Sequence, residues 1–299
     1  MAKRGKKRNY GMPTKAQWIS ILTALVLLFA WYAAERPDLN FWEIPPEGTV
    51  SVHYIDVGQG KSALICTPGG NMMIDTGDYD YIDKVSGYLR RHGVRTIDVL
   101  VATHPHGDHI GGMAAIINDF DIGTVIMPRA EGTGRAYERM LLAMREHNLR
   151  AHAPAAGETF NLGDTEFTVL APNSDSYENL NNFSIVLRMT YGMHSFVFTG
   201  DAEGLSEREM LRNRHDLSAD FLQIGHHGSR TSTTDSFLDA VSPRLVFISV
   251  GKGNSYGHPH PSVLERLEEY GVEIYRTDRH GDIVVESDGV QYKITTENP

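Results

Sequence analysis

The chain has a single cysteine, Cys66, among its 299 residues, so it has no partner for an internal disulfide. A small scaffold held together by disulfides is therefore excluded. Hydrophobic residues make up 41% of the sequence and charged residues 22%. This balance supports a packed core and excludes a disordered chain, a collagen-like repeat and a coiled coil. The length suits one large domain or two small ones.

Positive charge is scarce outside the N-terminus. Six of the 28 basic residues, and none of the 38 acidic residues, lie within the first 15 positions. The rest of the chain therefore carries 22 basic residues against 38 acidic ones. Such an acidic body does not suit a protein that coats nucleic acid without sequence preference, because the phosphate backbone attracts basic surfaces.

Residues 18–34 form a long hydrophobic run that contains no charged residue. Because the basic tip at 1–17 precedes it, the run predicts a single-pass membrane anchor with a cytoplasmic tip and an extracytoplasmic catalytic domain. A cleaved signal peptide, which would give a secreted protein, and a buried core helix are the alternatives. Cleavage is disfavoured because Trp31 or Tyr32 would stand three positions before the cut, where a small residue is needed. The polar, proline-bearing stretch 35–48 predicts a linker.

The remaining residues, 49–299, predict one α/β domain. Short apolar runs with strand character occur in clusters and alternate with single helical patterns, which is typical of sheets covered by helices. Strands are expected at 50–57, 62–66, 71–75, 97–103, 123–127, 165–170, 183–190, 194–199, 220–225, 244–250, 273–276, 282–286 and 290–295. Helices are expected near 81–92, 110–118, 134–147, 204–214, 234–241 and 261–270.

The segment THPHGDHIGG at 103–112 is the strongest chemical signal in the sequence. Three histidines and an aspartate fall within six residues, directly after a predicted buried strand: His104, His106, Asp108 and His109. Imidazole and carboxylate ligands suit Zn, Mn or Fe, and the lack of a thiolate ligand means that nothing selects Zn strongly; Zn or Mn is the expected metal. One loop serves two ions if the first two residues bind one ion and the last two bind the other. Two such ions can hold a bridging hydroxide for hydrolysis.

Further ligands are expected where other strands end. Asp201 ends the apolar strand FVFTGD and suits a carboxylate that bridges two ions, although a helix cap is the simpler interpretation of that position. His226 and His227 follow the next predicted strand, and one of them should complete the second ion. Strand position alone does not decide between the two.

These motifs resemble the metallo-β-lactamase fold, and in particular its ComEC-type branch. The HxHxDH pattern of residues 104–109 carries the resemblance to the fold. The resemblance to the branch rests on VGQG at 57–60, DTG at 75–77, NNFSIVL at 181–187, FTGD at 198–201, HHGS at 226–229 and YGHP at 256–259. The branch occurs as the hydrolase domain of DNA-uptake competence proteins and as separate anchored or secreted proteins. The resemblance implies a four-layer αββα sandwich with the metals at one edge.

The resemblance also implies roles for single residues. His104 and His106 would bind the first of two divalent ions, and Asp201 would bridge the two. Asp108, His109 and His227 would bind the second, with His226 the less favoured ligand. Asp75 would lie behind the ligands and orient one of them or the water.

The sequence departs from the wider family in one respect. Many members have a further ligand histidine between the HxHxDH loop and the bridging aspartate. Here only His147, His152 and His194 lie in that interval, and none is well placed. Asn181 or Asn182 of the NNFS motif is expected to support the site or touch substrate instead.

A metal-bound hydroxide predicts hydrolysis but leaves the substrate open. The resemblance implies a phosphodiesterase, a nuclease that acts on extracellular DNA during uptake. Asp108 is expected to be essential as a ligand, and His226 and His258 to take part in catalysis, the latter by protonating a leaving alkoxide. Ser229, Asn254 and Tyr256 are expected to contact substrate. The alternatives are an envelope or small-molecule phosphoesterase similar to phosphorylcholine esterases, and a non-catalytic partner of a DNA-uptake channel. An aromatic pocket, to which Tyr79, Tyr81, Tyr137 and Tyr256 are possible contributors, would favour the first alternative.

Overall fold

The computed structural model describes residues 14, 15, 18, 21, 23 and 48–299. The chain divides into two units, Met1–Glu43 and Ile44–Pro299. The predicted basic tip, anchor and linker span residues 1–48, and most of these lie outside the described residues. Within the described part of the chain, no helix combines the length and the hydrophobicity that a membrane span requires. Both β-sheets belong to the second unit.

Eight strands form the first sheet. Their bounds are β1 Val50–Tyr54, β2 Ser62–Thr67, β3 Gly70–Thr76, β4 Thr96–Val101, β5 Asp121–Ile126, β6 Ala151–His152, β14 Ile283–Ser287 and β15 Tyr292–Thr296. The order across the sheet is β15-β14-β1-β2-β3-β4-β5-β6. The pairs from β15 to β3 are antiparallel, whereas those from β3 to β6 are parallel.

Seven strands form the second sheet. Their bounds are β7 Thr159–Leu162, β8 Thr165–Ala171, β9 Val186–Tyr191, β10 His194–Phe198, β11 Phe221–Gln223, β12 Leu245–Ile248 and β13 Glu273–Arg276. The order is β13-β12-β11-β10-β9-β8-β7, and again one half, β10 to β13, is parallel while the other is antiparallel.

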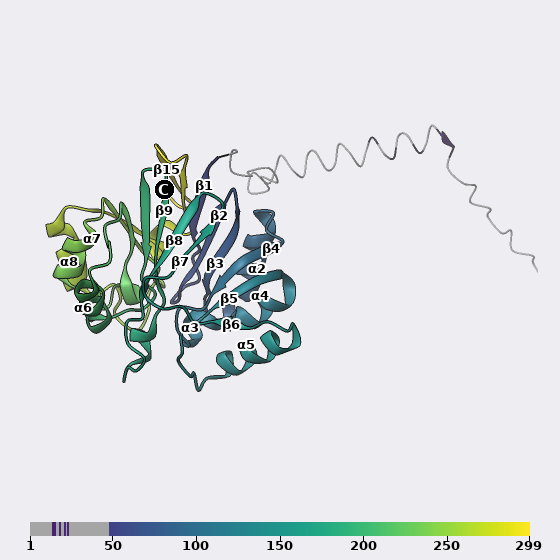
Figure 1. The fold of residues 1–299 in the computed structure, drawn as a ribbon. Helices are drawn as coiled ribbons and strands as arrows, with labels where there is room; N and C mark the ends of the chain where they lie inside the picture. The colour runs from purple at the N-terminus through teal and green to yellow at the C-terminus, as the bar shows by residue number, and fades with distance from the viewer. Residues whose placement is uncertain (1–13, 16–17, 19–20, 22, 24–47) are drawn as a thin grey trace, which may run out of the picture. The chain divides into compact units, whose positions relative to one another are not determined.

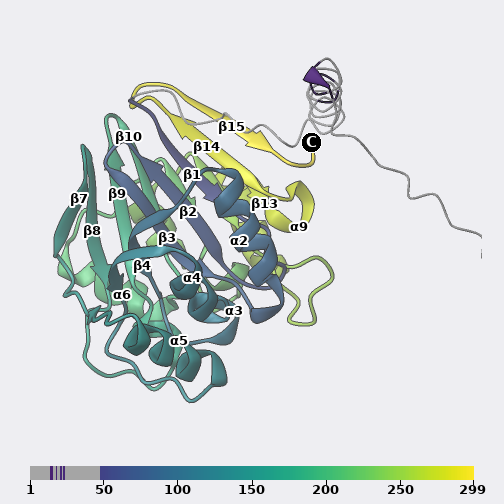
Figure 2. The same ribbon diagram turned by 90° about the vertical axis from the view of Figure 1, so that its right-hand side faces the viewer.

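Helices cover the outer face of each sheet (Figure 1). Their bounds are α2 Ile82–Arg91, α3 Gly107–Ile110, α4 Met113–Asp119, α5 Arg135–Glu146, α6 Gly204–Asn213, α7 Asp235–Val241, α8 Pro261–Tyr270 and α9 Thr277–His280. Helices α2, α4 and α5 lie across the first sheet, as Figure 2 shows, and α6, α7 and α8 cover the second. The layer order of helix, sheet, sheet and helix agrees with the expected sandwich.

Three apolar layers hold these four layers together. The central layer joins the facing sides of the two sheets, where the rings of Tyr54 and Phe247 stack 4.4 Å apart. The outer layers lie between each sheet and its helices, with Leu89 buried on one side and Phe237 on the other. All five residues of β1 are buried because both faces of its sheet are covered, and Val50, Val52 and Tyr54 belong to the central layer.

The parallel half of each sheet determines where the polar loops gather. Parallel strands end at the same edge, so the loops after β3 and β4 of the first sheet lie together, as do those after β10, β11 and β12 of the second. The ends of the two parallel halves meet, and the candidate site lies there.

Candidate metal centre

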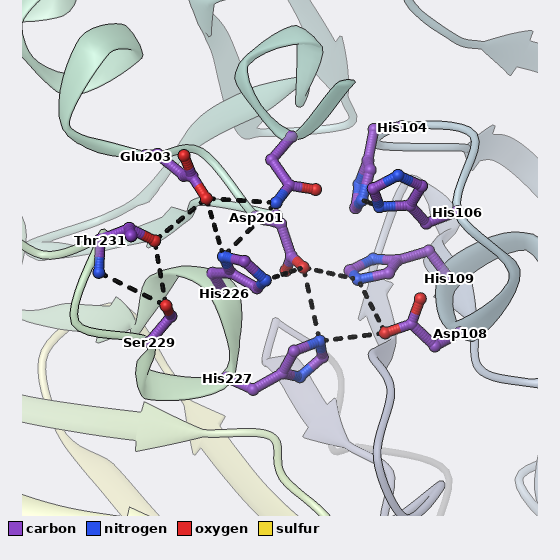
Figure 3. A network of polar contacts seen from close by, with 12 residues as sticks. His104, His106, Asp108, His109, Asp201, Glu203, His226, His227, Ser229 and Thr231 are labelled. Atoms are coloured by element: carbon purple, nitrogen blue, oxygen red, sulfur yellow. Dashed lines mark hydrogen bonds and ion pairs between the residues drawn. The ribbon is translucent and has the colours of Figure 1, made fainter. Parts of the chain in front are cut away.

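Five chain segments supply the candidate site, and Figure 3 labels residues from 104–109, 201–203 and 226–231. From the first sheet come Asp75, near the end of β3, and the loop 103–109 after β4. From the second sheet come Asp201 after β10, the short 3-10 turn η3 (Gly225–Gly228) after β11, and the loop 249–258 after β12. The site therefore depends on the two sheets being packed correctly against each other.

Four residues form a group that could hold a metal ion: Asp108, His109, Asp201 and His227. One ligand atom from each lies within 4.8 Å of all the others. Asp201 Oδ2 is 3.2 Å from His109 Nε2 and 3.4 Å from His227 Nε2. Asp108 Oδ2 is 3.3 Å from His227 Nε2. Two imidazoles and two carboxylates are a donor set that Zn or Mn accepts.

The histidines of this group are oriented with Nε2 towards its centre. His109 Nδ1–H donates to Asp75 Oδ2 over 2.6 Å, and His227 Nδ1–H donates to the Ser249 carbonyl over 2.8 Å. Their Nε2 atoms are buried and have no hydrogen-bond partner among the described residues. Buried nitrogens without a partner are costly, so their convergence on two carboxylates fits a bound cation.

The charges of the group are strongly coupled. Burial opposes a charge on His109, but the carboxylates of Asp201, Asp75 and Asp108 outweigh burial and raise its pKa well above the ordinary value. The pKa of His227 is also raised, because Asp201 and Asp108 outweigh its burial. Burial alone would raise the pKa of Asp201, yet His109 and His227 lower it well below its ordinary value. Because a ligand imidazole must be unprotonated, a cation that binds here displaces protons.

His104 and His106 lie next to this group. His104 Nε2 and His106 Nδ1 are 2.9 Å apart, and the rings of His104 and His109 have centroids 4.2 Å apart. His104 is fully buried, and its Nδ1 lies 3.2 Å from Thr103 Oγ1 and 3.4 Å from Ser184 Oγ. Among the described residues, the pair does not form a group of three ligands of its own. The structure thus presents one four-ligand group with a histidine pair beside it.

The three histidines of the 110–200 interval lie away from the site. His147 is exposed and contacts Asn118, and His152 is exposed and contacts Glu158. His194 is buried, with Nδ1 2.6 Å from the hydroxyl of Ser287. None of them replaces the ligand that the sequence lacks.

The NNFS motif forms the 3-10 turn η2 (Leu180–Phe183) beside the centre. Asn182 is buried, and its Oδ1 accepts from the backbone N–H groups of Glu203 and Ser206, both at 3.3 Å, which fixes the start of α6. Asn181 Nδ2 donates to Glu203 Oε1 over 3.3 Å and lies 3.4 Å from His226 Nδ1. Asn182 therefore supports the loop of Asp201, while Asn181 faces the site.

The choice between His226 and His227 follows from the geometry of the η3 turn. Both residues have left-handed backbone angles, with φ of 47° and 55°, which non-glycine residues adopt at a cost of about 1 to 3 kcal/mol. This turn directs His227 into the four-ligand group. His226 Nδ1 instead lies 3.2 Å from Glu203 Oε1, and its Nε2 is 3.8 Å from Asp201 Oδ2. Glu203 was not expected, because a glutamate just before a predicted helix is typical of an ordinary polar helix start.

A cavity of about 370 Å³ opens onto the centre. Its lining comprises Gln59, His106, Gly107, Asp108, Asn181, Asp201, His226, His227, Tyr256 and His258. Burial lowers the pKa of His258 to about 4, and His226 and His227 act in the same direction. The cavity is therefore lined both by members of the four-ligand group and by the His258 imidazole.

Two expected substrate contacts do not line this cavity. Ser229 is buried, and its hydroxyl lies 2.9 Å from Thr231 Oγ1. Asn254 Nδ2 donates to the carbonyl of His258 over 2.6 Å, and its Oδ1 accepts from the N–H of Tyr256 over 3.1 Å. Asn254 thereby shapes the loop that carries Tyr256 and His258 to the cavity.

A buried lysine that was not expected from the sequence also belongs to the site. Lys61 is 2% exposed, and its Nζ lies 3.6 Å from Asp201 Oδ1. Burial lowers the pKa of Lys61, while the charges of Asp201, Asp75 and Asp108 oppose that change. Its position directly after the VGQG motif was the one available signal, but a lone lysine next to a strand is usually exposed.

Comparison with known proteins identifies the family. A model described as the metallo-beta-lactamase superfamily matches residues 55–252. ComE operon protein 3 of Bacillus subtilis is 32% identical over 255 residues, which are 79% of this chain and 33% of that protein. Competence protein ComA of Neisseria gonorrhoeae is 30% identical over 258 residues, 86% of this chain and 34% of that protein. The chain spans about one third of the length of these relatives.

The solved structures agree on the fold. The metallo-beta-lactamase fold protein YhfI of Bacillus subtilis superposes with a TM-score of 0.54 at 13% identity, over 80% of this chain and 99% of that one. The resemblance drawn from the HxHxDH, HHGS and related motifs is therefore confirmed. The chain belongs to the metallo-β-lactamase superfamily, and its relatives include competence proteins.

Proposed function

We propose that this metal-dependent hydrolase is a phosphodiesterase that cleaves DNA. The observation that carries the proposal is the group of Asp108, His109, Asp201 and His227, whose unpartnered nitrogens and carboxylate oxygens converge at a cavity lined by further imidazoles. A divalent ion held there would supply the Lewis acidity that activates water and the positive charge that stabilises phosphoryl oxygens. In this proposal His104 and His106 would hold the second of the two expected ions, and Zn and Mn suit both sets of ligands.

The residues of the chain take separate tasks in this proposal. Asp75 and the Ser249 carbonyl fix the ligand imidazoles in one tautomer, so that each presents Nε2. Burial lowers the pKa of His226, although Asp201 opposes it, so this residue is neutral near pH 7. With Glu203 against its Nδ1, His226 is suited to accept a proton at Nε2 from an attacking water.

For His258 we propose a role other than the expected one. An imidazole whose pKa is about 4 is neutral near pH 7. The imidazolium form that could protonate a leaving alkoxide is therefore scarce at that pH. We therefore assign His258 and Tyr256, which line the same cavity, to hydrogen bonds with substrate.

The choice of DNA as substrate rests on the relatives, among them one named a competence protein. The acidic body of the chain requires that the ion, rather than a basic surface, supply the attraction for phosphate. The proposal retains the membrane anchor at 18–34, an extracytoplasmic site and a DNA-uptake channel as partner, all of which rest on the sequence.

The phosphorylcholine alternative is less well supported. Recognition of a quaternary ammonium group needs several aromatic faces. Among the described residues that line the cavity, Tyr256 is the only tyrosine, phenylalanine or tryptophan. Tyr79 is exposed and stacks instead with Arg139, whose guanidinium lies 4.9 Å from the ring centroid.

A substrate panel tests the proposal. The full chain is incubated with Mn or Zn and with linear DNA, bis-p-nitrophenyl phosphate or p-nitrophenyl phosphorylcholine. Cleavage of the first two substrates is expected, and Asp108→Ala should abolish it, whereas Asp119→Ala on the surface of α4 should not. Cleavage of the phosphorylcholine ester alone would replace DNA by the alternative substrate. Full activity of Asp108→Ala would refute the site.

A further inference from the structure

Lys61 is a buried cation whose Nζ lies among oxygen atoms of the segments that follow β10 and β11. It lies directly before β2, in the first sheet. Its Nζ donates to the carbonyl of Gly200 and, over 2.9 Å, to the carbonyl of Ile224, and it is 3.6 Å from Asp201 Oδ1. The ammonium group therefore makes two hydrogen bonds to carbonyls and a longer ion pair with Asp201.

The two carbonyls belong to the segments that carry ligands. Gly200 immediately precedes Asp201, and Ile224 immediately precedes the η3 turn that contains His227. The Lys61 side chain therefore ties together the ends of β10 and β11 at the points where the chain delivers two of the four ligands.

The Lys61 backbone is tied to the other half of the centre. Its N–H donates to the carbonyl of Asp108 over 3.1 Å, and its own carbonyl accepts from the N–H of Gly77 over 2.8 Å. The preceding Gly60 permits this approach, because a Cβ there would lie 2.5 Å from the Asp108 carbonyl oxygen. One residue thus contacts both ligand-bearing loops of the second sheet and the ligand-bearing loop of the first.

The arrangement also divides the two oxygens of Asp201. Oδ1 faces the ammonium group, whereas Oδ2 faces the Nε2 atoms of His109 and His227. The ion pair with Oδ1 favours an orientation of the carboxylate in which Oδ2 is available to an ion.

We propose that Lys61 is a positioning residue that couples the two halves of the metal centre and orients Asp201 for the ion. The inference rests on the proposed metal-dependent function. It predicts that Lys61 acts on metal binding through its hydrogen bonds, separately from its charge, since removal of a positive charge alone would strengthen the binding of a cation.

Two neutral substitutions separate these effects. Lys61→Gln and Lys61→Met both remove the charge, but only glutamine can still donate to a carbonyl or to Asp201. Binding of Mn to the full chain is measured for both by titration calorimetry, alongside the wild type. We expect the methionine variant to bind Mn about 10-fold to 100-fold more weakly than the glutamine variant, the range found for residues that orient ligands.

Matched controls show whether the effect belongs to this site. Lys84 also lies between two carboxylates, Asp56 and Asp282, but away from the centre, so Lys84→Gln and Lys84→Met should bind Mn equally. In an Asp201→Asn background the difference between the two Lys61 variants should shrink, because the oriented carboxylate is gone. If Lys61 only stabilised the fold, the difference between its two variants would not depend on Asp201.

Each remaining outcome has a defined meaning. Equal Mn affinity of folded Lys61→Gln and Lys61→Met overturns the inference and leaves the proposed function standing. Loss of cooperative unfolding in both variants also overturns it, since Lys61 would then serve the whole fold rather than the centre. Failure of the wild-type chain to bind Mn or Zn overturns the proposed function itself.

Discussion

Asp75 Oδ2 lies 2.6 Å from Nδ1 of His109, and both groups are fully buried. The same carboxylate accepts from the backbone N–H of Thr103 over 2.8 Å and from its hydroxyl over 2.7 Å. Asp75 thus links the end of β3 to the loop that carries the HxHxDH residues. The contact makes His109 present Nε2, rather than Nδ1, to the four-ligand group.

Asp75→Asn should weaken metal binding without removing a ligand. An amide retains the shape of the carboxylate but loses the charge that stabilises the Nδ1–H tautomer of His109. The expected loss of Mn affinity is about 10-fold to 100-fold, measured by titration calorimetry. Asp98→Asn, at an acidic residue of β4 that accepts from the Asn71 backbone, serves as control and should bind Mn as the wild type does. Unchanged affinity in Asp75→Asn would mean that the contact does not orient the ligand.

Substitutions of the two histidines of the η3 turn should have different effects. His227→Asn should lose bound metal, as measured by elemental analysis, because it removes a member of the four-ligand group. His226→Asn should retain the metal and lose roughly 100-fold or more in kcat, the scale of a lost proton acceptor. Asparagine tolerates the left-handed backbone at both positions, so the pair is matched. The reverse pattern would exchange the roles of the two residues.

A pH effect is expected from His53, far from the metal ligands in the sequence and buried between Ser51 and Tyr88. Burial, helped by His92, lowers the pKa of His53 from 6.5 to about 3. The unfolded chain therefore takes up a proton near pH 6.5 and the folded chain does not. The contribution of His53 to stability is full above that pH and falls by about 1.4 kcal/mol per pH unit below it, down to its folded pKa.

Urea unfolding at pH 7, 6, 5 and 4 measures this contribution. The difference in free energy of unfolding between the wild type and His53→Gln should shrink by about 1 kcal/mol or more per pH unit in the acid range. The exposed His147→Gln should show no such trend. A difference that stays constant from pH 7 to pH 4 would show that His53 is protonated in the folded chain.

Salt should affect DNA and a small diester differently. Linear DNA is a polyanion whose binding depends on counterion release, whereas bis-p-nitrophenyl phosphate carries one charge. Because the body of the chain is acidic, raising NaCl from about 50 to about 200 mM should lower DNA cleavage about tenfold or more and change cleavage of the small diester less than about twofold. Equal sensitivity of both substrates would argue against an extended DNA contact.

Most of the elements could be predicted from the sequence, because apolar strand patterns and amphipathic helices report burial directly. The four-layer order was expected only from the family resemblance. The short strands β6 and β7 were not expected, since their residues are mostly exposed. The helix expected at 110–118 is divided into α3 and α4 at Gly111 and Gly112. A Cβ on Gly111 would lie 2.4 Å from the Tyr79 backbone nitrogen, a close contact that no local pattern reveals.

The site was only partly predictable, for a similar reason. The HxHxDH loop stands out because three histidines within six residues are unusual. Asp201 stands out because a carboxylate directly follows an apolar strand. Glu203, Lys61 and the Ser249 carbonyl do not stand out, since their contacts join segments more than 20 residues apart in the chain or use the backbone. Even the choice between His226 and His227 required the turn geometry that points their rings in different directions.

The central claim is that cleavage depends on an ion held by Asp108, His109, Asp201 and His227. The most direct test adds Mn stepwise to the metal-free full chain and measures bound Mn and cleavage of linear DNA in the same samples. We predict no cleavage without metal and a rate that rises in proportion to occupancy of the site. Cleavage that persists in the metal-free chain, or that stays absent when the site is filled, would contradict the claim.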